Sequence, residues 1–93
     1  MKDENINIEE YTTIFKALAH PTRLTIAYNL MLQPECNVSK MCECLQIPQP
    51  TVSQHLTILK NANVISGHRH ANQICYKVEN PKVIRILEQI AKD

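Results

Sequence analysis

The chain has 93 residues, 44% of them hydrophobic and 4% aromatic, and its formal net charge is +1. This length predicts one small domain over residues 1–93, and no apolar run approaches the roughly 20 residues of a membrane span. The acidic, polar N-terminus is not typical of a secretory signal. We therefore expect a cytoplasmic protein whose four cysteines are reduced thiols, metal ligands or redox sensors, and not structural disulfides.

Positive charge gathers in one part of the chain. Residues 1–15 carry a net charge of −3, whereas residues 40–78 carry +3 together with three of the four histidines. A local excess of positive charge is the electrostatic footprint of many nucleic-acid-binding surfaces. The distribution of charge therefore says more about function than the total.

Two helices are predicted before residue 35. Residues 1–7 are expected to form a disordered tail, and the next helix follows the apolar spacing of Ile8, Tyr11, Phe15 and Leu18, with Ile14 widening the stripe. His20 ends that helix, because the residue before a proline avoids the α region. Pro21 then opens a second helix, which ends at Gln33, Pro34 and Glu35.

A short helix, a tight turn and a longer helix come next. Asn37 is a suitable N-cap for a helix that ends near Leu45, and the longer helix covers Pro48 to Ala62. Its buried stripe is Val52, Leu56 and Leu59, and its polar side carries Ser53, Gln54, Thr57 and Asn61. Short amides and hydroxyls suit base edges and phosphates, although a merely solvated polar face is the alternative. This spacing is typical of a helix-turn-helix.

A two-stranded wing is predicted after this helix. Val64 and Ile65 begin the first strand, and the second alternates apolar Ile74, Tyr76 and Val78 with Gln73, Cys75 and Lys77. Between them lies a polar turn in which Asn72 is the candidate left-handed residue. The basic tip, His68, Arg69 and His70, suits phosphates or an adjacent minor groove, with an ordinary solvated turn as the alternative.

Pro81 opens the last helix, which runs to about Lys92 and has a wide apolar stripe. Such a stripe at the end of a small domain implies a second surface to cover. A two-fold homodimer through the first and last helices is the economical solution, and it presents two recognition helices to a palindromic operator. The expected interface residues are Ile8, Tyr11, Phe15, Val83, Ile86, Leu87 and Ile90.

Two segments make the chain resemble the ArsR (SmtB/ArsR) family of bacterial winged-helix repressors. They are Phe15–Leu24 (FKALAHPTRL) and Pro48–Leu56 (PQPTVSQHL), followed by the wing strand Gln73–Val78. The resemblance covers roughly residues 11–90. It implies a homodimer that represses its own operon by binding double-stranded operator DNA and releases the DNA when an effector binds.

The expected fold is therefore mainly α with a small β-hairpin wing, a winged helix-turn-helix with the element order ααααββα. By the family's pattern, the start of the recognition helix enters the major groove. The expected DNA-contacting residues are Gln49, Pro50, Thr51, Ser53, Gln54 and Thr57 on the recognition helix, and Lys60, His68, Arg69 and His70 on the DNA backbone or in the minor groove.

Four cysteines are candidate metal ligands or redox-active thiols. Cys42 and Cys44 lie about 200° apart around a helix axis, so an intact helix cannot aim both at one ion. A thiophilic Zn or As ion would need a distorted helix and a further ligand such as Cys36. Cys75 lies beside Lys77 and is a candidate reactive thiol. The alternatives are a small core residue at Cys42, an exposed wing residue at Cys75, and no cysteine effector.

The family's familiar metal motifs do not match this chain. Its metal-sensing Cys-x-Cys pair lies at the start of the third helix, where this chain has Asn37 and Ser39, and the last helix contains no histidine. The resemblance therefore favours members without those inducing metal sites, including redox- or sulfur-responsive ones and constitutive repressors.

Other function classes leave little signature. The sequence shows no nucleophile triad, paired carboxylates or Gly-rich phosphate loop, so it does not predict an enzyme. Two alternatives to a DNA-binding regulator are a protein-binding winged helix without DNA affinity and a metal-buffering protein.

Overall fold

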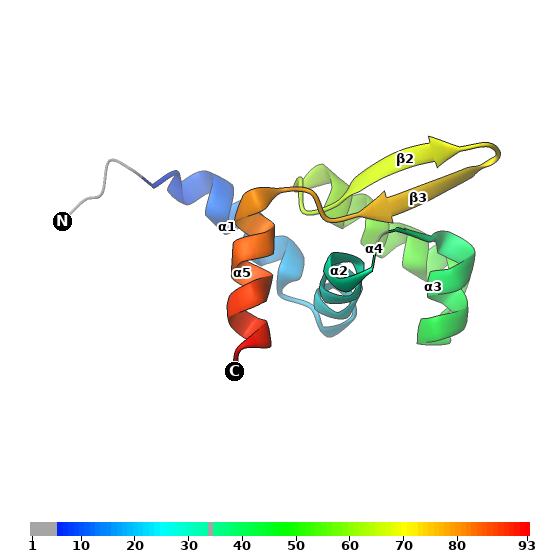
Figure 1. The fold of residues 1–93 in the computed structure, drawn as a ribbon, viewed down its shortest axis with the longest axis horizontal. Helices are drawn as coiled ribbons and strands as arrows, with labels where there is room; N and C mark the ends of the chain where they lie inside the picture. The colour runs from blue at the N-terminus through cyan, green and yellow to red at the C-terminus, as the bar shows by residue number, and fades with distance from the viewer. Residues whose placement is uncertain (1–5, 34) are drawn as a thin grey trace.

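The computed structural model describes residues 6–33 and 35–93. Its elements (Figure 1) are α1 (Ile8–Leu18), α2 (Pro21–Leu32), β1 (Cys36–Asn37), α3 (Val38–Leu45), α4 (Gln49–Asn61), β2 (Ser66–His70), β3 (Gln73–Lys77) and α5 (Pro81–Ala91). The mainly α architecture with a β-hairpin is confirmed, with β1 as an additional strand. No helix of the described part is long and apolar enough to cross a membrane.

Side chains fix where most of the helices begin. The residues Asn7, His20, Asn37 and Asn80 each accept a hydrogen bond from a backbone N–H of the first turn. Such caps satisfy donors that have no partner within the helix. Asn7 therefore belongs to the start of α1, whereas residues 1–5 of the expected tail lie outside the described residues.

The helix-turn-helix is formed by α3 and α4 as expected. Gln46 follows α3 in the left-handed conformation, with φ of 56°, a conformation that glycine more often supplies. The apolar stripe of α4 is buried, with exposed fractions of 0%, 2% and 0% at Val52, Leu56 and Leu59. The predicted core face of α4 is confirmed.

The apolar stripe of α1 is divided between the core and the surface. Ile14, Ala17 and Leu18 are buried, whereas Ile8 and Phe15 are 65% and 51% exposed. The apolar residues of α1 cover more of its circumference than one face, and the core takes only part of them. An apolar strip of α1 therefore remains on the surface.

The wing differs from the expected one in three respects. Val64 and Ile65 are buried before the first strand begins, and residues 66–70, expected in the turn, form β2. The left-handed residue of the turn is Ala71, with φ of 55°, rather than Asn72. Because the first strand continues to His70 and the second begins at Gln73, the turn shrinks to residues 71–72.

The sheet contains a third strand. β1 pairs antiparallel with β3, with Cys36 opposite Tyr76 and Asn37 opposite Cys75, so the strand order is β1-β3-β2. β1 immediately precedes α3. The wing is therefore hydrogen-bonded to the start of the helix-turn-helix instead of projecting alone.

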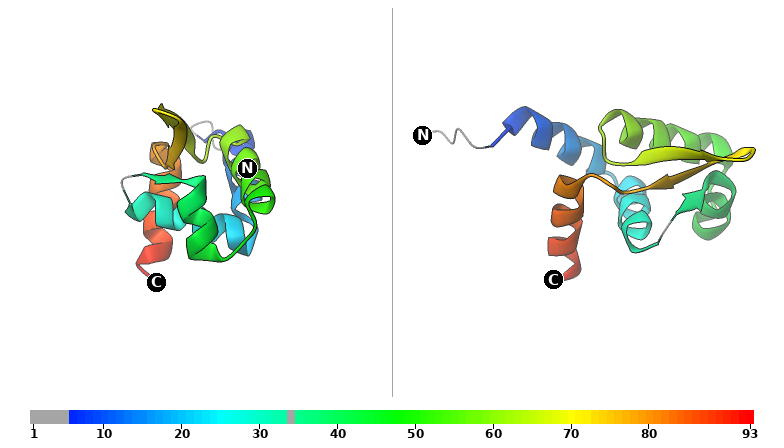
Figure 2. Two further views of the ribbon diagram at one scale, coloured as in Figure 1. Left: turned by 90° about the vertical axis from the view of Figure 1, so that its right-hand side faces the viewer. Right: turned by 45° about the horizontal axis from the view of Figure 1, so that its top comes forward.

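The last helix divides its apolar residues between the core and the surface. Val83 and Leu87, expected at a dimer interface, are 0% exposed within this chain, so they have no surface left for a partner. Ile90 is 45% exposed, and Tyr11 and Ile86 are half-buried. The wing tip lies at one end of the molecule, beside α3 and α4, and the start of α1 lies at the other (Figure 2).

The buried stripe of α4 generates a stability prediction. Leu59→Ala should lower the free energy of unfolding by about 2–4 kcal/mol, because it leaves a cavity at a fully buried position. Urea denaturation followed by circular dichroism measures the change. The matched control is the neighbouring Ile58→Ala, where the side chain is 43% exposed, and the loss should be about 1 kcal/mol or less. Equal losses in the two variants would contradict the packing described here.

Candidate nucleic-acid interface

The outward face of α4 is polar and accessible. Gln49, Pro50, Thr51, Gln54, Thr57, Lys60 and Asn61 are exposed, and Ser53 is half-buried. The hydroxyl of Thr57 donates to the carbonyl of Ser53 at 3.0 Å, within the helix. The amide of Gln54 makes no hydrogen bond within residues 6–33 and 35–93. Gln54 is therefore the free long amide near the middle of this face.

The basic tip of the wing is not one continuous patch. Successive residues of a strand point to opposite faces, so Arg69 lies on one face of β2, and His68 and His70 lie on the other. Arg69 is exposed. The tip expected from sequence therefore separates into a single arginine and a pair of histidines.

Each of these histidines contacts a carboxylate. His68 Nε2 lies 2.8 Å from Glu79 Oε1, and His70 Nε2 lies 3.0 Å from Glu35 Oε2. Hydrogen bonding with His68 first, and then with Ser66 and Lys77, lowers the pKa of Glu79 to about 2. Sequence reasoning missed both partners. Glu35 could not be found from sequence, because β1 was not expected. Glu79 directly follows the expected second strand of the wing, but its spacing alone does not indicate a contact with His68.

A second polar cluster holds α4 against the first two helices. Arg23 Nε donates to the carbonyl of Ala17 at 2.7 Å, and its Nη1 lies 3.4 Å from His55 Nδ1. The ring of His20 lies 4.6 Å from that of His55, measured between centroids. A guanidinium only donates hydrogen bonds, so His55 accepts through Nδ1 and carries its proton on Nε2. His55 therefore positions α4.

Burial lowers the pKa of His55, and the nearby His20 and Arg23 lower it further. This cluster includes the residues at the junction between α1 and α2, but no pattern in the sequence indicates that Arg23 reaches α4. The signal that could have found it is the pairing of an arginine early in one helix with a histidine on the inner edge of another.

The four cysteines do not gather at one place. All are free thiols, with Cys36 buried, Cys42 and Cys75 half-buried and Cys44 exposed. Burial raises the pKa of Cys36, and Cys44 and Cys75 raise it further against the opposing effect of Lys40. Cys42 packs against the core, as expected if it is a small core residue and not a ligand.

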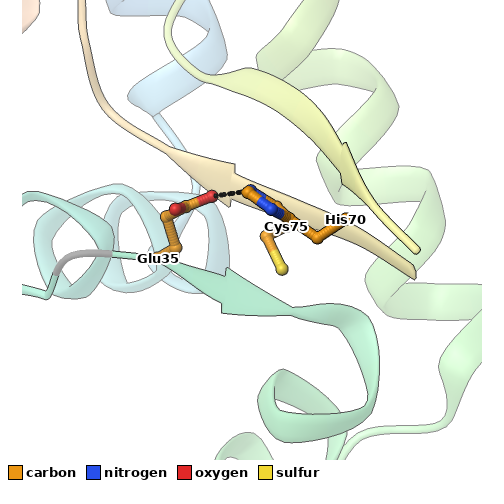
Figure 3. Close-up of side chains that lie close together, drawn as sticks. All are labelled: Glu35, His70 and Cys75. Atoms are coloured by element: carbon orange, nitrogen blue, oxygen red, sulfur yellow. Dashed lines mark hydrogen bonds and ion pairs between the residues drawn. The ribbon is translucent and has the colours of Figure 1, made fainter. Parts of the chain in front are cut away.

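Two separate groupings replace the expected set of thiols. Cys36 and Cys44 both line a hollow between α2 and α3. Cys75 lies instead with Glu35 and His70 on the sheet (Figure 3). A single site built from Cys36, Cys42, Cys44 and Cys75 is therefore not formed in this structure.

Comparisons with known proteins point to transcriptional regulators. Residues 20–66 match the family model described as bacterial regulatory protein, arsR family. The transcriptional repressor PagR of Bacillus anthracis is 36% identical over 87 residues, which cover 94% of this chain and 87% of that protein. The biofilm growth-associated repressor of Agrobacterium fabrum is 38% identical over 81 residues, covering 87% of this chain and 68% of that protein.

Solved structures agree with these sequence matches. The crystal structure of PagR has a TM-score of 0.82 at 35% identity and covers 89% of this chain and 94% of that chain. A homodimeric winged helix-turn-helix DNA-binding domain of Mycobacterium bovis, Mb0332, has a TM-score of 0.80 at 23% identity, covering 90% and 77%. At this identity, the likeness to Mb0332 shows only that the two chains share a fold. These relatives are regulators rather than enzymes.

The environment of His55 generates a pH prediction. Because its pKa is lowered in the folded state, the unfolded chain binds the proton more readily than the folded one. The free energy of unfolding should therefore fall as the pH drops below about 6.5, the usual histidine pKa. Urea denaturation at several pH values measures this fall.

His55→Gln should remove part of that pH dependence. His68→Gln is the matched control, because His68 is an exposed histidine on the wing and leaves the cluster around Arg23 intact. A variant at position 55 with the same dependence on pH as the wild-type chain would show that His55 is not the group responsible.

Proposed function

This chain belongs to the arsR family of bacterial regulatory proteins, and on that premise we propose that it is a homodimeric transcriptional repressor that binds an inverted-repeat operator through α4. The observation that carries the proposal is the division of α4 into two faces. Its apolar stripe is buried, and the exposed face opposite has no acidic residue. A helix anchored in this way can present its polar face to the major groove.

The side chains of α4 suit two kinds of DNA contact. The Gln54 amide can form a bidentate pair with adenine, and hydroxyls such as that of Thr51 can reach base edges or phosphates. Gln49, Pro50 and Ser53 complete the face that approaches the groove, while Thr57 and Lys60 lie toward the end of the helix, where Lys60 suits a phosphate.

The wing supplies a contact beside the helix. Arg69 is exposed near its tip, and arginine binds phosphates and narrow minor grooves without reading sequence in detail. His68 and His70 can contribute only if they exchange their carboxylate partners for phosphates. We therefore assign the principal wing contact to Arg69.

Exposed apolar residues support a homodimer through α1 and α5. Ile8, Phe15 and Ile90 are 45–65% exposed, and Tyr11 stacks against Phe15 with ring centroids 6.5 Å apart. Lys82 pairs with Glu10 and lies 5.6 Å from the ring centroid of Tyr11, joining the two helices. Pairing two copies through this face leaves both wings and both α4 helices free for DNA.

We further propose that the repressor acts on its own operon in the bacterial cytoplasm and is released by a thiol-reactive effector, an oxidant or a metal or metalloid such as Zn or As. A repressor without a cysteine effector is the alternative.

A protein-binding winged helix is the second candidate function. The observation that favours it is the net charge of only +1, together with wing histidines that are already paired with glutamates.

Gln54→Ala should weaken binding to the specific site by roughly 1–3 kcal/mol, because it removes a base contact. Fluorescence anisotropy of the reduced protein on its own promoter DNA and on random duplex measures both affinities. Binding to random duplex should change little. A promoter affinity unchanged by the substitution would contradict the role of Gln54.

Arg69→Ala provides the contrast. It should weaken binding to promoter and random DNA alike and flatten the salt dependence, because it removes a phosphate contact. Lys92→Ala is the matched control, since this basic residue caps the end of α5, away from the wing. The protein-binding interpretation would be favoured if the wild-type chain showed neither a promoter preference nor a steep loss of affinity with salt.

Phe15→Glu should convert the dimer to a monomer, because it places a charge in the proposed apolar interface. Sedimentation velocity measures the molecular mass in solution. Leu32→Glu is the matched control, because Leu32 is 61% exposed at the end of α2, outside the proposed interface. Dissociation in the control alone would place the interface elsewhere.

A further inference from the structure

We propose that the outer face of the wing sheet holds a site for a zinc-class divalent cation, with Glu35, His70 and Cys75 as its ligands. One ligand atom from each of these residues lies within 4.8 Å of the other two. Figure 3 shows the three side chains converging from different segments of the chain. The site is separate from the face of α4 and from the hollow that Cys36 and Cys44 line.

The register of the sheet explains why these residues meet. Cys75 lies on the central strand β3, directly opposite Asn37 on β1 and His68 on β2. His70 pairs with Gln73, so it is the diagonal neighbour of Cys75 on β2. Glu35 lies immediately before β1, and its carboxylate reaches His70 Nε2 at 3.0 Å. Diagonal neighbours across strands are within reach of long side chains.

The ligand geometry needs only a small adjustment. Around a tetrahedral zinc ion, with bonds of about 2.0–2.3 Å, ligand atoms lie about 3–4 Å apart. His70 Nε2 and Glu35 Oε2 already lie 3.0 Å apart. Both side chains are partly accessible, with exposed fractions of 58% and 32%, so they can move to meet an ion. The site therefore combines an accessible pair with a thiol held on the central strand.

The donor atoms select the class of ion. A thiolate, an imidazole and a carboxylate together suit zinc and similar ions, whereas calcium and magnesium prefer all-oxygen ligands. Binding would convert the Cys75 thiol to a thiolate and release its proton, so affinity should rise with pH. Three protein ligands leave the fourth position for water or another group.

The surrounding charges are compatible with a bound cation. Lys77 shares the face of β3 with Cys75, and its Nζ lies 3.4 Å from Glu79 Oε2. That carboxylate offsets the positive charge of the lysine. Cys36 cannot complete the site from its present position, because it pairs with Tyr76 on the opposite face of the sheet.

The site can be tested with cobalt(II) as a spectroscopic probe on the reduced full-length chain. We expect one equivalent of cobalt to produce thiolate-to-metal charge-transfer absorption, and one equivalent of zinc to displace it. Cys75→Ser should abolish the absorption. His70→Ala and Glu35→Gln should each weaken the cobalt affinity by roughly tenfold or more, because even the loss of a residue that only supports a metal ligand costs that much. The affinity should fall as the pH is lowered, because protons compete with the metal for the thiolate.

Cys44→Ser is the matched control, because Cys44 is an exposed thiol on α3, and it should leave the absorption unchanged. The proposal is overturned if the wild-type chain gives no thiolate absorption, or if Cys75→Ser retains it. It is also overturned if Cys44→Ser loses the absorption while His70→Ala keeps it, which would place the metal at α3. Circular dichroism checks each variant, and if Cys75→Ser does not fold, the two surface variants at positions 35 and 70 decide the question.

Discussion

The burial of the apolar stripe on α4 is the constraint on which the rest of the structure depends. Val52, Leu56 and Leu59 are enclosed by the core, and this fixes the rotation of the helix about its axis. A helix that cannot rotate must keep its opposite face in solvent. The polar face of α4 is therefore exposed to solvent as a direct consequence of the packing of its apolar face.

The cluster of Arg23 and His55 fixes the same helix from another side. Hydrogen bonds from Arg23 reach the end of α1 and the middle of α4, so three helices meet at one guanidinium. Apolar packing sets the rotation of α4, whereas this directional contact also restrains its position along the axis. The two kinds of contact together give a rigid platform, which suits a surface that must match the spacing of a DNA groove.

Sequence reasoning predicted the helices well because their signals are local. Pro21, Pro81 and Asn37 mark helix starts that the structure confirms, and the α4 stripe lies where its spacing placed it. The wing was less predictable. A two-residue strand such as β1 has no periodicity to detect, and Val64 and Ile65 look like strand residues although the core takes them.

The candidate DNA-binding surface also has a part that could be predicted from sequence and a part that could not. The exposed face of α4 follows from helical spacing, so Gln54 could be placed from sequence alone. The partners of His68 and His70 could not, because they depend on strand register and on a pairing between segments far apart in the chain. Val83 and Leu87 were assigned to an interface because spacing shows that a face is apolar without showing which neighbour covers it.

Asn37 forms hydrogen bonds with both the wing and the helix-turn-helix. Its Oδ1 accepts from the backbone N–H of Lys40 at 2.9 Å and caps α3, while its Nδ2 donates to Gln73 Oε1 on β3, also at 2.9 Å. A helix cap contributes about 1 kcal/mol. Moving the hairpin away from β1 would break the hydrogen bond between Gln73 and the amide that caps α3, so the wing and the first turn of α3 depend on the same side chain. A contact that holds the hairpin in place would therefore also hold the cap of α3, the helix that packs against α4.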